Sequence, residues 1–240
     1  MKKRIRLTLI GLFLLPFLGL NAKELNYGDS LATVHKNEVM VYFQFGKNIL
    51  NSYYGGFTGF YKRNFGKRVE VIGGLNLSTK NPNGFGGVSG EVLYRIPIGN
   101  ANLKFTNKAM YNYYGQSEMN EFVDRIAAIW QTRYVELIFG NSFLTYWSLG
   151  SSVFEPVTLT IGMSANLKPI ENPWNVSMFI RNYDDFFVEN FNINFGIKGY
   201  YDLLPQWRTF AELMVRPAGS MNQLAVKYET AFKFGVKYKW

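Results

Sequence analysis

The stretch VTLTIGMSANL, residues 157–167, carries an apolar side chain at every second position. Its Val, Leu, Ile, Met and Ala residues share one parity, and its Thr, Gly, Ser and Asn residues share the other. Successive residues of a β-strand point to opposite faces, whereas apolar residues on one face of a helix recur at intervals of three and four. The stretch therefore predicts a β-strand with one apolar and one polar face.

The same alternation recurs along the chain and predicts an all-β fold. Twelve strands are expected to begin near residues 39, 53, 69, 86, 102, 122, 134, 156, 174, 189, 207 and 229. Segments rich in Pro, Gly and Asn separate them, as is usual for turns. The strands that begin near 122 and 134 are divided only by QTR, residues 131–133, so fusion of this pair or of another would leave ten strands.

The N-terminus resembles a secretory signal peptide. Lys2, Lys3, Arg4 and Arg6 precede an apolar stretch over residues 7–20, and a possible cleavage site follows at Ala22. This stretch is shorter than the about 20 residues that a membrane-spanning helix needs. We therefore expect a cleaved signal over residues 1–22, a polar periplasmic lead-in over 23–37 and a single barrel over 38–240. The alternative is an uncleaved membrane anchor.

Composition excludes several classes of site. The chain has no Cys, so it offers no disulfide framework, thiolate metal site or thiol nucleophile. Its 26 Lys and Arg residues outnumber 17 Asp and Glu residues, but four of the basic residues lie in the predicted signal. The remaining basic residues are spread along the strands rather than clustered, which does not indicate nucleic-acid binding.

A secreted β-sandwich would also alternate apolar and polar faces, so the aromatic residues decide between the two folds. In a membrane barrel, Trp and Tyr collect where strands cross the bilayer interface. Trp174 and Trp207 begin strands, and Tyr201, Tyr238 and Trp240 lie near the ends of others. The pattern predicts an antiparallel transmembrane β-barrel with periplasmic N- and C-termini, in the outer membrane of a Gram-negative-type bacterium.

The chain ends on KFGVKYKW, residues 233–240, which resembles the C-terminal assembly signal of bacterial outer-membrane β-barrel proteins. Lys233 takes the polar place of that signal, Gly235 the glycine, and Tyr238 and Trp240 the aromatic places. The usual last residue is Phe, so Trp240 departs from the pattern. The resemblance implies recognition by the barrel-assembly machinery and closure of the last strand against the first. It also implies outer-membrane lipid and lipopolysaccharide as surroundings.

Strand parity assigns the polar face to the lumen. The predicted solute-lining residues are Arg95, Lys104, Lys108, Arg181, Lys198, Arg208 and Arg216. The same parity adds Lys227, Lys233 and Lys237, but only Glu91 and Glu212 as acids, and a basic constriction favours anions. Alternatively, pairs such as Arg95 with Glu91 fill the interior, as side chains do in small barrels.

Enzyme chemistry and metal binding find little support. His35, the one His, precedes the first strand, so it cannot activate a Ser on the barrel wall or join a multi-His metal site. We expect Asp184 and Asp185 to be a solvated pair of acids in an exposed loop. We predict no cofactor and no metal.

The sequence thus favours a channel for small hydrophilic, preferably anionic solutes. The alternative is a structural or adhesive barrel with a largely filled lumen. Residues 143–154, FLTYWSLGSSVF, are expected to form a long aromatic loop that folds into the pore or binds outside it.

Overall fold

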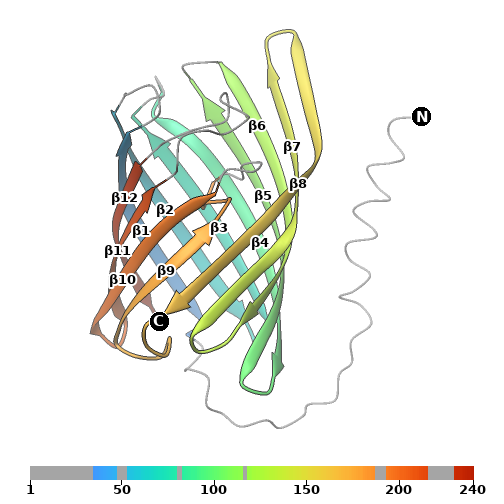
Figure 1. Ribbon diagram of the computed structural model, residues 1–240. Coiled ribbons are helices and arrows are strands. Elements are labelled where there is room, and N and C mark those ends of the chain that lie inside the picture. The colour runs from blue at the N-terminus through green and yellow to red at the C-terminus, as the bar shows by residue number, and fades with distance from the viewer. Residues whose placement is uncertain (1–34, 48–52, 80–82, 116–117, 187–192, 216–229) are drawn as a thin grey trace. The chain divides into compact units, whose positions relative to one another are not determined.

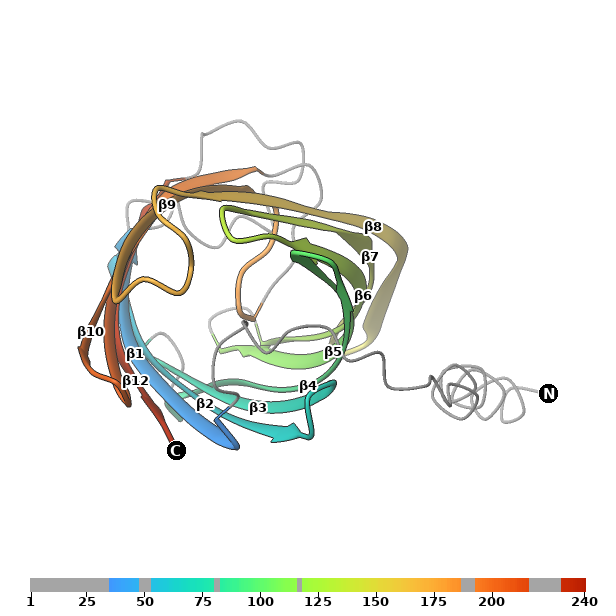
Figure 2. The same ribbon diagram turned by 90° about the horizontal axis from the view of Figure 1, so that it is seen from below.

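The computed structural model describes residues 35–47, 53–79, 83–115, 118–186, 193–215 and 230–240. These residues form twelve antiparallel strands that close into one barrel (Figure 1). Seen along the barrel axis, the strands form a ring, whose interior is here called the lumen (Figure 2). The described part of the chain contains no helix that is long and apolar enough to cross a membrane. The predicted signal peptide and all but the end of the predicted lead-in lie outside the described residues and stay predictions.

The strands follow one another around the barrel in chain order, and the last pairs with the first. They are β1 (Asn37–Lys47), β2 (Tyr53–Phe65), β3 (Val69–Ser78), β4 (Phe85–Ile98), β5 (Ala101–Tyr114), β6 (Met119–Gln131), β7 (Val135–Ser148), β8 (Ser151–Asn166), β9 (Trp174–Arg181), β10 (Asn194–Leu204), β11 (Trp207–Val215) and β12 (Thr230–Lys239).

The twelve predicted strands are confirmed, and the ten-strand alternative is wrong. β6 and β7 are separate strands that pair from Asn120 with Trp147 to Gln131 with Glu136. The short turn between them is closed by Thr132, whose hydroxyl accepts hydrogen bonds from the backbone N–H groups of Tyr134 and Val135. Residues 132–134 are therefore enough to reverse the chain here, and Gln131 belongs to β6.

The predicted long loop over residues 143–154 is instead a continuous hairpin. β7 runs to Ser148, β8 starts at Ser151, and the turn between them contains Gly150 at φ 89°. This backbone conformation is one that glycine adopts without steric cost. The hairpin reaches beyond the neighbouring strands (Figure 1). β7 and β8 pair along the whole hairpin, with one register shift between Ser142 and Leu144.

The outer face of the barrel is apolar, the reverse of a water-soluble protein. The side chains of Phe139 and Met178, for example, are 64% and 66% exposed. A patch of this kind extends around the wall, whereas soluble monomers rarely expose large contiguous apolar surfaces. The arrangement matches a face that meets lipid.

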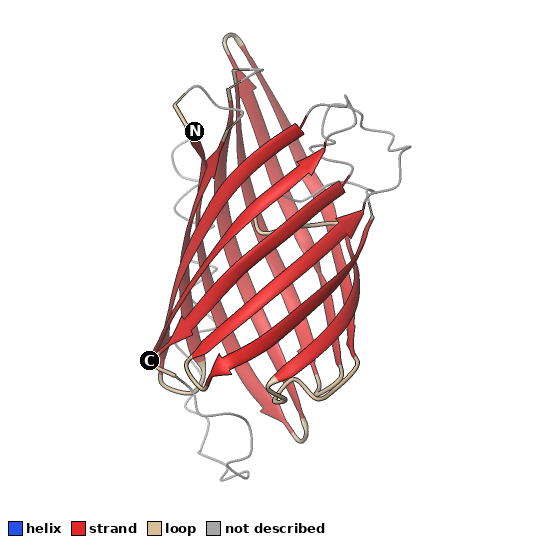
Figure 3. Ribbon diagram, turned by 90° about the vertical axis from the view of Figure 1, so that its left-hand side faces the viewer, coloured by secondary structure: helices blue, strands red, loops and turns tan. Residues whose placement is uncertain are grey.

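The two ends of the barrel differ. At one end, here called the terminal end, Asn37 and Trp240 exchange backbone hydrogen bonds of 2.9 and 3.0 Å. Short turns join the strands at this end (Figure 3). The other end is called the far end.

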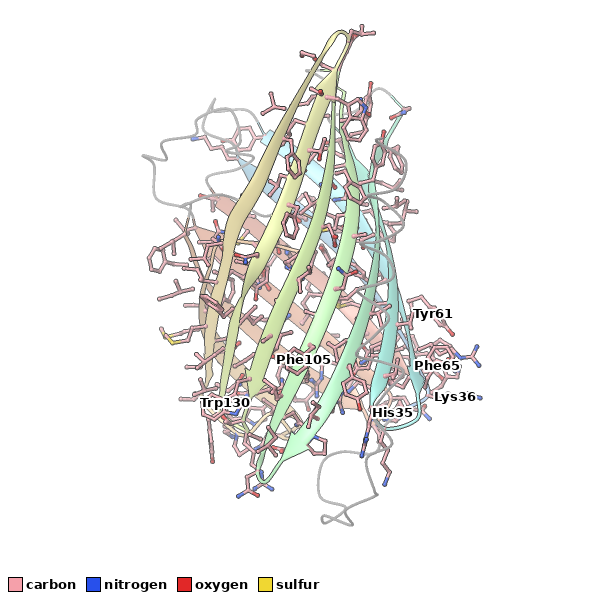
Figure 4. The ribbon with its side chains drawn as sticks, turned by 90° about the vertical axis from the view of Figure 1, so that its right-hand side faces the viewer. His35, Lys36, Tyr61, Phe65, Phe105 and Trp130 are labelled. Atoms are coloured by element: carbon pink, nitrogen blue, oxygen red, sulfur yellow. The ribbon has the colours of Figure 1, made fainter. Side chains whose placement is uncertain are left out.

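An aromatic belt surrounds the terminal end. Tyr61 and Trp130 lie on the outer surface there, with Phe65 and Phe105 nearby (Figure 4). The ring centroids of Tyr61 and Trp240 lie 6.4 Å apart, on the two sides of β1, which pairs with β2 and β12. Trp and Tyr favour the membrane interface because one end of each side chain is apolar and the other can hydrogen-bond. The belt therefore marks one edge of the lipid-facing band.

β12 closes the barrel by pairing with β1 from Glu38 opposite Lys239 to Lys47 opposite Thr230. This confirms the closure that the C-terminal resemblance implied. Gly235 leaves no room for a side chain, since a Cβ there would lie 2.3 Å from the Val41 carbonyl oxygen and 2.5 Å from the Tyr42 Cβ. The pairing of β12 with β1 therefore requires a glycine at this position of the terminal signal for steric reasons.

Candidate functional site

Charged side chains line the lumen. The inward-facing basic residues are Lys62, Arg95, Lys104, Lys108, Arg125, Arg181, Lys198, Arg208, Lys233, Lys237 and Lys239. The acids on the lumen side are Glu38, Glu70, Glu91, Glu121, Glu136, Asp184, Asp185, Asp202 and Glu212. Among the described residues, the two sets are nearly equal in number, so the basic excess is smaller than strand parity indicated.

Most of the predicted solute-lining residues take part in ion pairs. Arg95 bonds the Glu70 carboxylate, and the Lys108 Nζ lies 3.9 Å from Glu91. Arg208 holds both carboxylate oxygens of Asp202, with N–O distances of 2.5 and 2.9 Å. In these pairs, a carboxylate neutralises each of these basic side chains, which the sequence analysis had predicted to attract anions. Arg216 and Lys227 lie outside the described residues.

Arg181 and Lys198 meet at one carboxylate. The Arg181 guanidinium donates to Glu212 at 2.6 Å, and the Lys198 Nζ lies 3.8 Å from the other oxygen of the same group. Lys233 also approaches Glu212, at 3.5 Å. Glu212 is almost fully buried, and a buried carboxylate needs such partners because burial disfavours its charge.

The chain leaves the wall after β9 and enters the lumen. Residues 182–186, here called the inward segment, lie inside the ring of strands (Figure 2). The side chain of Asn182 starts the departure by donating to the Leu159 carbonyl at 2.5 Å and accepting from the Ile161 N–H at 2.8 Å. It satisfies β8 backbone groups at the point where β9 ends.

Tyr183 packs against the β6 and β8 walls. The Arg125 guanidinium lies over its ring, 4.7 Å from the centroid. The ring fits because Gly162 has no side chain, and a Cβ there would lie 2.8 Å from ring atoms. Gly162 therefore makes the space for Tyr183.

Asp184 and Asp185 are held by cations from β9 and β12. Arg181 donates to Asp184 at 3.0 Å, and the Lys233 Nζ bonds Asp184 and also Asp185, the latter at 3.2 Å. The Tyr42 hydroxyl donates to Asp185 at 2.5 Å. The expectation of a solvated pair in an exposed loop is therefore wrong, because the segment folds inward onto residues distant in sequence.

The charge of Asp185 is stabilised by these neighbours. Burial raises the pKa of its carboxyl, but the ammonium groups of Lys233 and Lys108 and the Tyr42 hydrogen bond outweigh that effect and hold the pKa below its usual range. The carboxylate therefore stays ionised, and its contacts are kept as the pH falls through the ordinary range for Asp.

Phe186 anchors the end of the inward segment. Its ring lies 5.7 Å from that of Phe60 on β2, and its carbonyl accepts a hydrogen bond from the Asn112 amide on β5 at 2.6 Å. The inward segment thus contacts β1, β2, β5, β6, β8 and β12, which places it across the lumen.

Two cavities flank the inward segment. One, of about 250 Å³, borders Asp185 and is lined by Glu38, Lys62, Glu70 and Lys108, among others. The other, of about 130 Å³, borders Tyr183 and is lined by Glu136, Ser177, Arg181 and Lys198, among others. A water molecule occupies about 30 Å³ of liquid, so both can hold several waters among polar partners.

Three lumen cations stand apart from the ion pairs. Among the described residues, Arg125, Lys104 and, at the terminal end, Lys239 have no carboxylate oxygen within 4.0 Å. Arg125 is only 7% exposed, and its Nε and Nη1 atoms lack hydrogen-bond partners in the same residues. Sequence reasoning included Lys104 but missed Arg125, because the alternation in β6 is weak.

His35 and the acids offer no metal site within the described ranges. His35 precedes β1 at the terminal end (Figure 4), where its backbone carbonyl accepts a hydrogen bond from Asn64 at 2.5 Å. No group of three His, Cys, Asp or Glu side chains in the described part of the chain could hold a metal ion.

Comparison with solved structures identifies the fold. The KdgM porin is 9% identical, with a TM-score of 0.55 over 85% of this chain and 99% of the porin. An outer membrane channel from Pseudomonas putida F1 is 11% identical, with a TM-score of 0.56 over 90% of this chain and all of that one. The chain has the fold of bacterial outer-membrane β-barrels.

The likeness extends beyond porins and is one of fold alone. The translocator domain of the autotransporter NalP from Neisseria meningitidis is 13% identical, with a TM-score of 0.50 over 88% of this chain and 90% of the domain. No protein-family model matches the sequence, and no curated protein matches it significantly.

Proposed function

We propose that the protein is a narrow outer-membrane channel for small hydrophilic solutes, with its termini on the periplasmic side. The observation that carries the proposal is the charged lumen, crossed by an inward segment that ion pairs hold in place. Charged groups are costly in a dry interior, whereas a water-filled passage solvates them. In barrels of about eight strands, side chains fill the interior. A barrel of twelve strands is wider and encloses more space.

We further propose a modest preference for anions. Arg125 and Lys104 are the cations that carry it, because neither is offset by a nearby carboxylate in the described residues, and because the third unpaired cation, Lys239, lies at the terminal end of the barrel. At moderate salt the Debye length is about 8–10 Å, so their fields reach across a narrow passage. The KdgM porin is described in complex with oligogalacturonate, which is compatible with acidic solutes for this fold but does not name a solute here.

Replacing Arg125 and Lys104 together with Gln should reduce the ratio of chloride to potassium permeability toward one. The cause is the loss of two cations without the loss of any partner carboxylate. Reversal potentials across a salt gradient in planar bilayers measure the ratio.

The matched control removes an ion pair as a whole. Arg208→Gln with Asp202→Asn deletes one cation and the anion that it binds, so the permeability ratio should stay near that of the unmodified channel. Equal effects of both double variants, or cation preference in the unmodified protein, would contradict the assignment to Arg125 and Lys104.

Localisation follows from the same proposal. The mature chain should appear in the outer membrane, inserted by the barrel-assembly machinery among phospholipid and lipopolysaccharide, and should migrate differently on gels before and after heating. Folded protein recovered from the periplasm without detergent would rule the membrane barrel out.

A filled structural barrel is the second candidate, and the inward segment is the observation that favours it. The Phe186 ring packs into an apolar cluster with Tyr42, Phe60 and Phe210 inside the lumen. Conductance separates the two candidates, since a filled barrel passes no ion current.

A further inference from the structure

Three polar side chains lie close together on the outer face of the barrel, on neighbouring strands. Asn107 on β5, Asp124 on β6 and Asn141 on β7 point outward, because the residue that follows each of them is buried on the lumen side. The Asn107 amide donates a hydrogen bond of 2.7 Å to the Asp124 Oδ1 atom. These three residues are called the outer polar patch.

The outer polar patch lies near the middle of the lipid-facing band. Asp124 is six positions along β6 from Trp130, which belongs to the aromatic belt. At about 3.4 Å per residue and a strand tilt of about 40°, this corresponds to a height of about 15 Å. The apolar band of an outer-membrane barrel is about 25 Å tall, so the carboxylate faces hydrocarbon well away from either interface.

Part of the outer polar patch lacks a partner within the described chain. The Asn141 side chain is exposed and makes no hydrogen bond to another described residue, and the Asp124 carboxylate uses only its Oδ1 atom, for Asn107. Lipid tails can neither donate nor accept hydrogen bonds, so exposed polar groups at this depth are costly. A second protein surface would supply what lipid cannot.

The wall beside the outer polar patch is unusually smooth. The register places Gly73 opposite Gly90, Gly90 opposite Ala109 and Ala109 opposite Asp124, all on the outer face. A Cβ added at Gly73 or Gly90 would meet nothing within 4 Å. Small residues let two membrane-embedded surfaces approach closely.

We propose that the outer polar patch is the contact surface for a second copy of this chain. Copies inserted by one route have the same orientation, so a two-fold axis between them runs along the membrane normal. An axis between β6 and β7 places Asp124 of each copy opposite Asn141 of the other. The register sets Asn141 opposite Ile126, and the tilt of the strands brings it to nearly the same depth as Asp124.

This pairing is self-complementary. The Asn141 amide donates to the free oxygen of Asp124, and the symmetry makes the same bond twice. The Gly73–Gly90 part of the wall then lies beside the contact. The proposal depends on the membrane location and not on whether the lumen conducts.

The test measures the oligomeric mass of the full-length protein. Native mass spectrometry in mild detergent should show a dimer for the unmodified chain and a monomer for the variant Asp124→Leu with Asn141→Leu. Thr209→Leu changes an outward polar residue on β11, away from the outer polar patch, and should leave the dimer intact. Heat-modifiable gel mobility checks that each variant is folded.

A second readout uses isolated outer membranes. The chain has no Cys, so Ile126→Cys, opposite Asn141 on the outer face, creates its single thiol and leaves the outer polar patch intact. A short thiol-specific crosslinker should then give a covalent dimer. A monomeric unmodified protein, or a dimer that survives the Leu double variant, would overturn the proposal. Lipopolysaccharide retained by a monomer and lost from the variant would also overturn it, by showing that the outer polar patch holds lipid.

Discussion

Replacing Asp184 and Asp185 together with Asn is expected to raise single-channel conductance several-fold. The two carboxylates hold the inward segment to Arg181, Lys233 and Tyr42, and breaking a buried ion pair by removing one partner costs about 3–5 kcal/mol. The segment should then leave its place across the lumen. Anion preference should rise as well, because Arg181 and Lys233 lose neutralising partners. Planar-bilayer recordings measure both quantities.

Glu136→Gln is the matched control for this variant. It removes an acidic side chain that lines one lumen cavity but hydrogen-bonds to Gln131 in the wall rather than to the inward segment. Its conductance should stay close to that of the unmodified protein. If the Asp184 and Asp185 variant conducts no better than this control, the inward segment is not the constriction.

The second large effect is expected in assembly. Gly235→Val should abolish most of the folded protein in the membrane, because its side chain would overlap the Val41 backbone and Tyr42 in the seam that closes the barrel. Deleting Trp240 should slow insertion, since it removes the backbone pair with Asn37 and the ring beside Tyr61. Heat-modifiable mobility and the amount of protein in outer-membrane fractions measure folding.

Gly73→Val is the control for Gly235→Val. It shows whether a β-branched residue reduces folding at any glycine position or only where the added side chain has no space. Gly73 faces outward, and an added Cβ meets nothing within 4 Å, so this variant should yield a normal amount of folded barrel. Normal amounts of the Gly235→Val and Trp240-deleted proteins would remove the terminal motif from the account of assembly.

Period-two alternation predicted the strands well because each strand has one face toward lipid and one toward the lumen. Even glycine-rich β2 follows this rule, as Phe57 and Tyr61 face outward while Thr58 and Phe60 face inward. The 143–154 segment was misjudged because Gly150 and the flanking Ser residues resemble a loop. Only the observed pairing of Ser148 with Ser151 shows that the turn is tight.

The constriction could not be predicted from local sequence. Asp184 and Asp185 lie in the short polar segment between two predicted strands, which is typical of a solvated loop. Their partners are remote, since Tyr42 is 143 residues from Asp185 and Lys233 is 49 residues from Asp184. Parity also listed the basic residues of regular strands but missed acids such as Glu38 and Glu70, so the lumen seemed more positive than the structure makes it.

Ion current through the unmodified protein, purified, folded and inserted into planar bilayers, tests the central claim most directly. The account predicts discrete, low-conductance steps with chloride more permeant than potassium, and a preference that weakens as the salt concentration rises. Absence of current from the unmodified protein, with folded insertion verified, would contradict it, and absence of current from the Asp184→Asn, Asp185→Asn variant as well would leave a filled structural barrel.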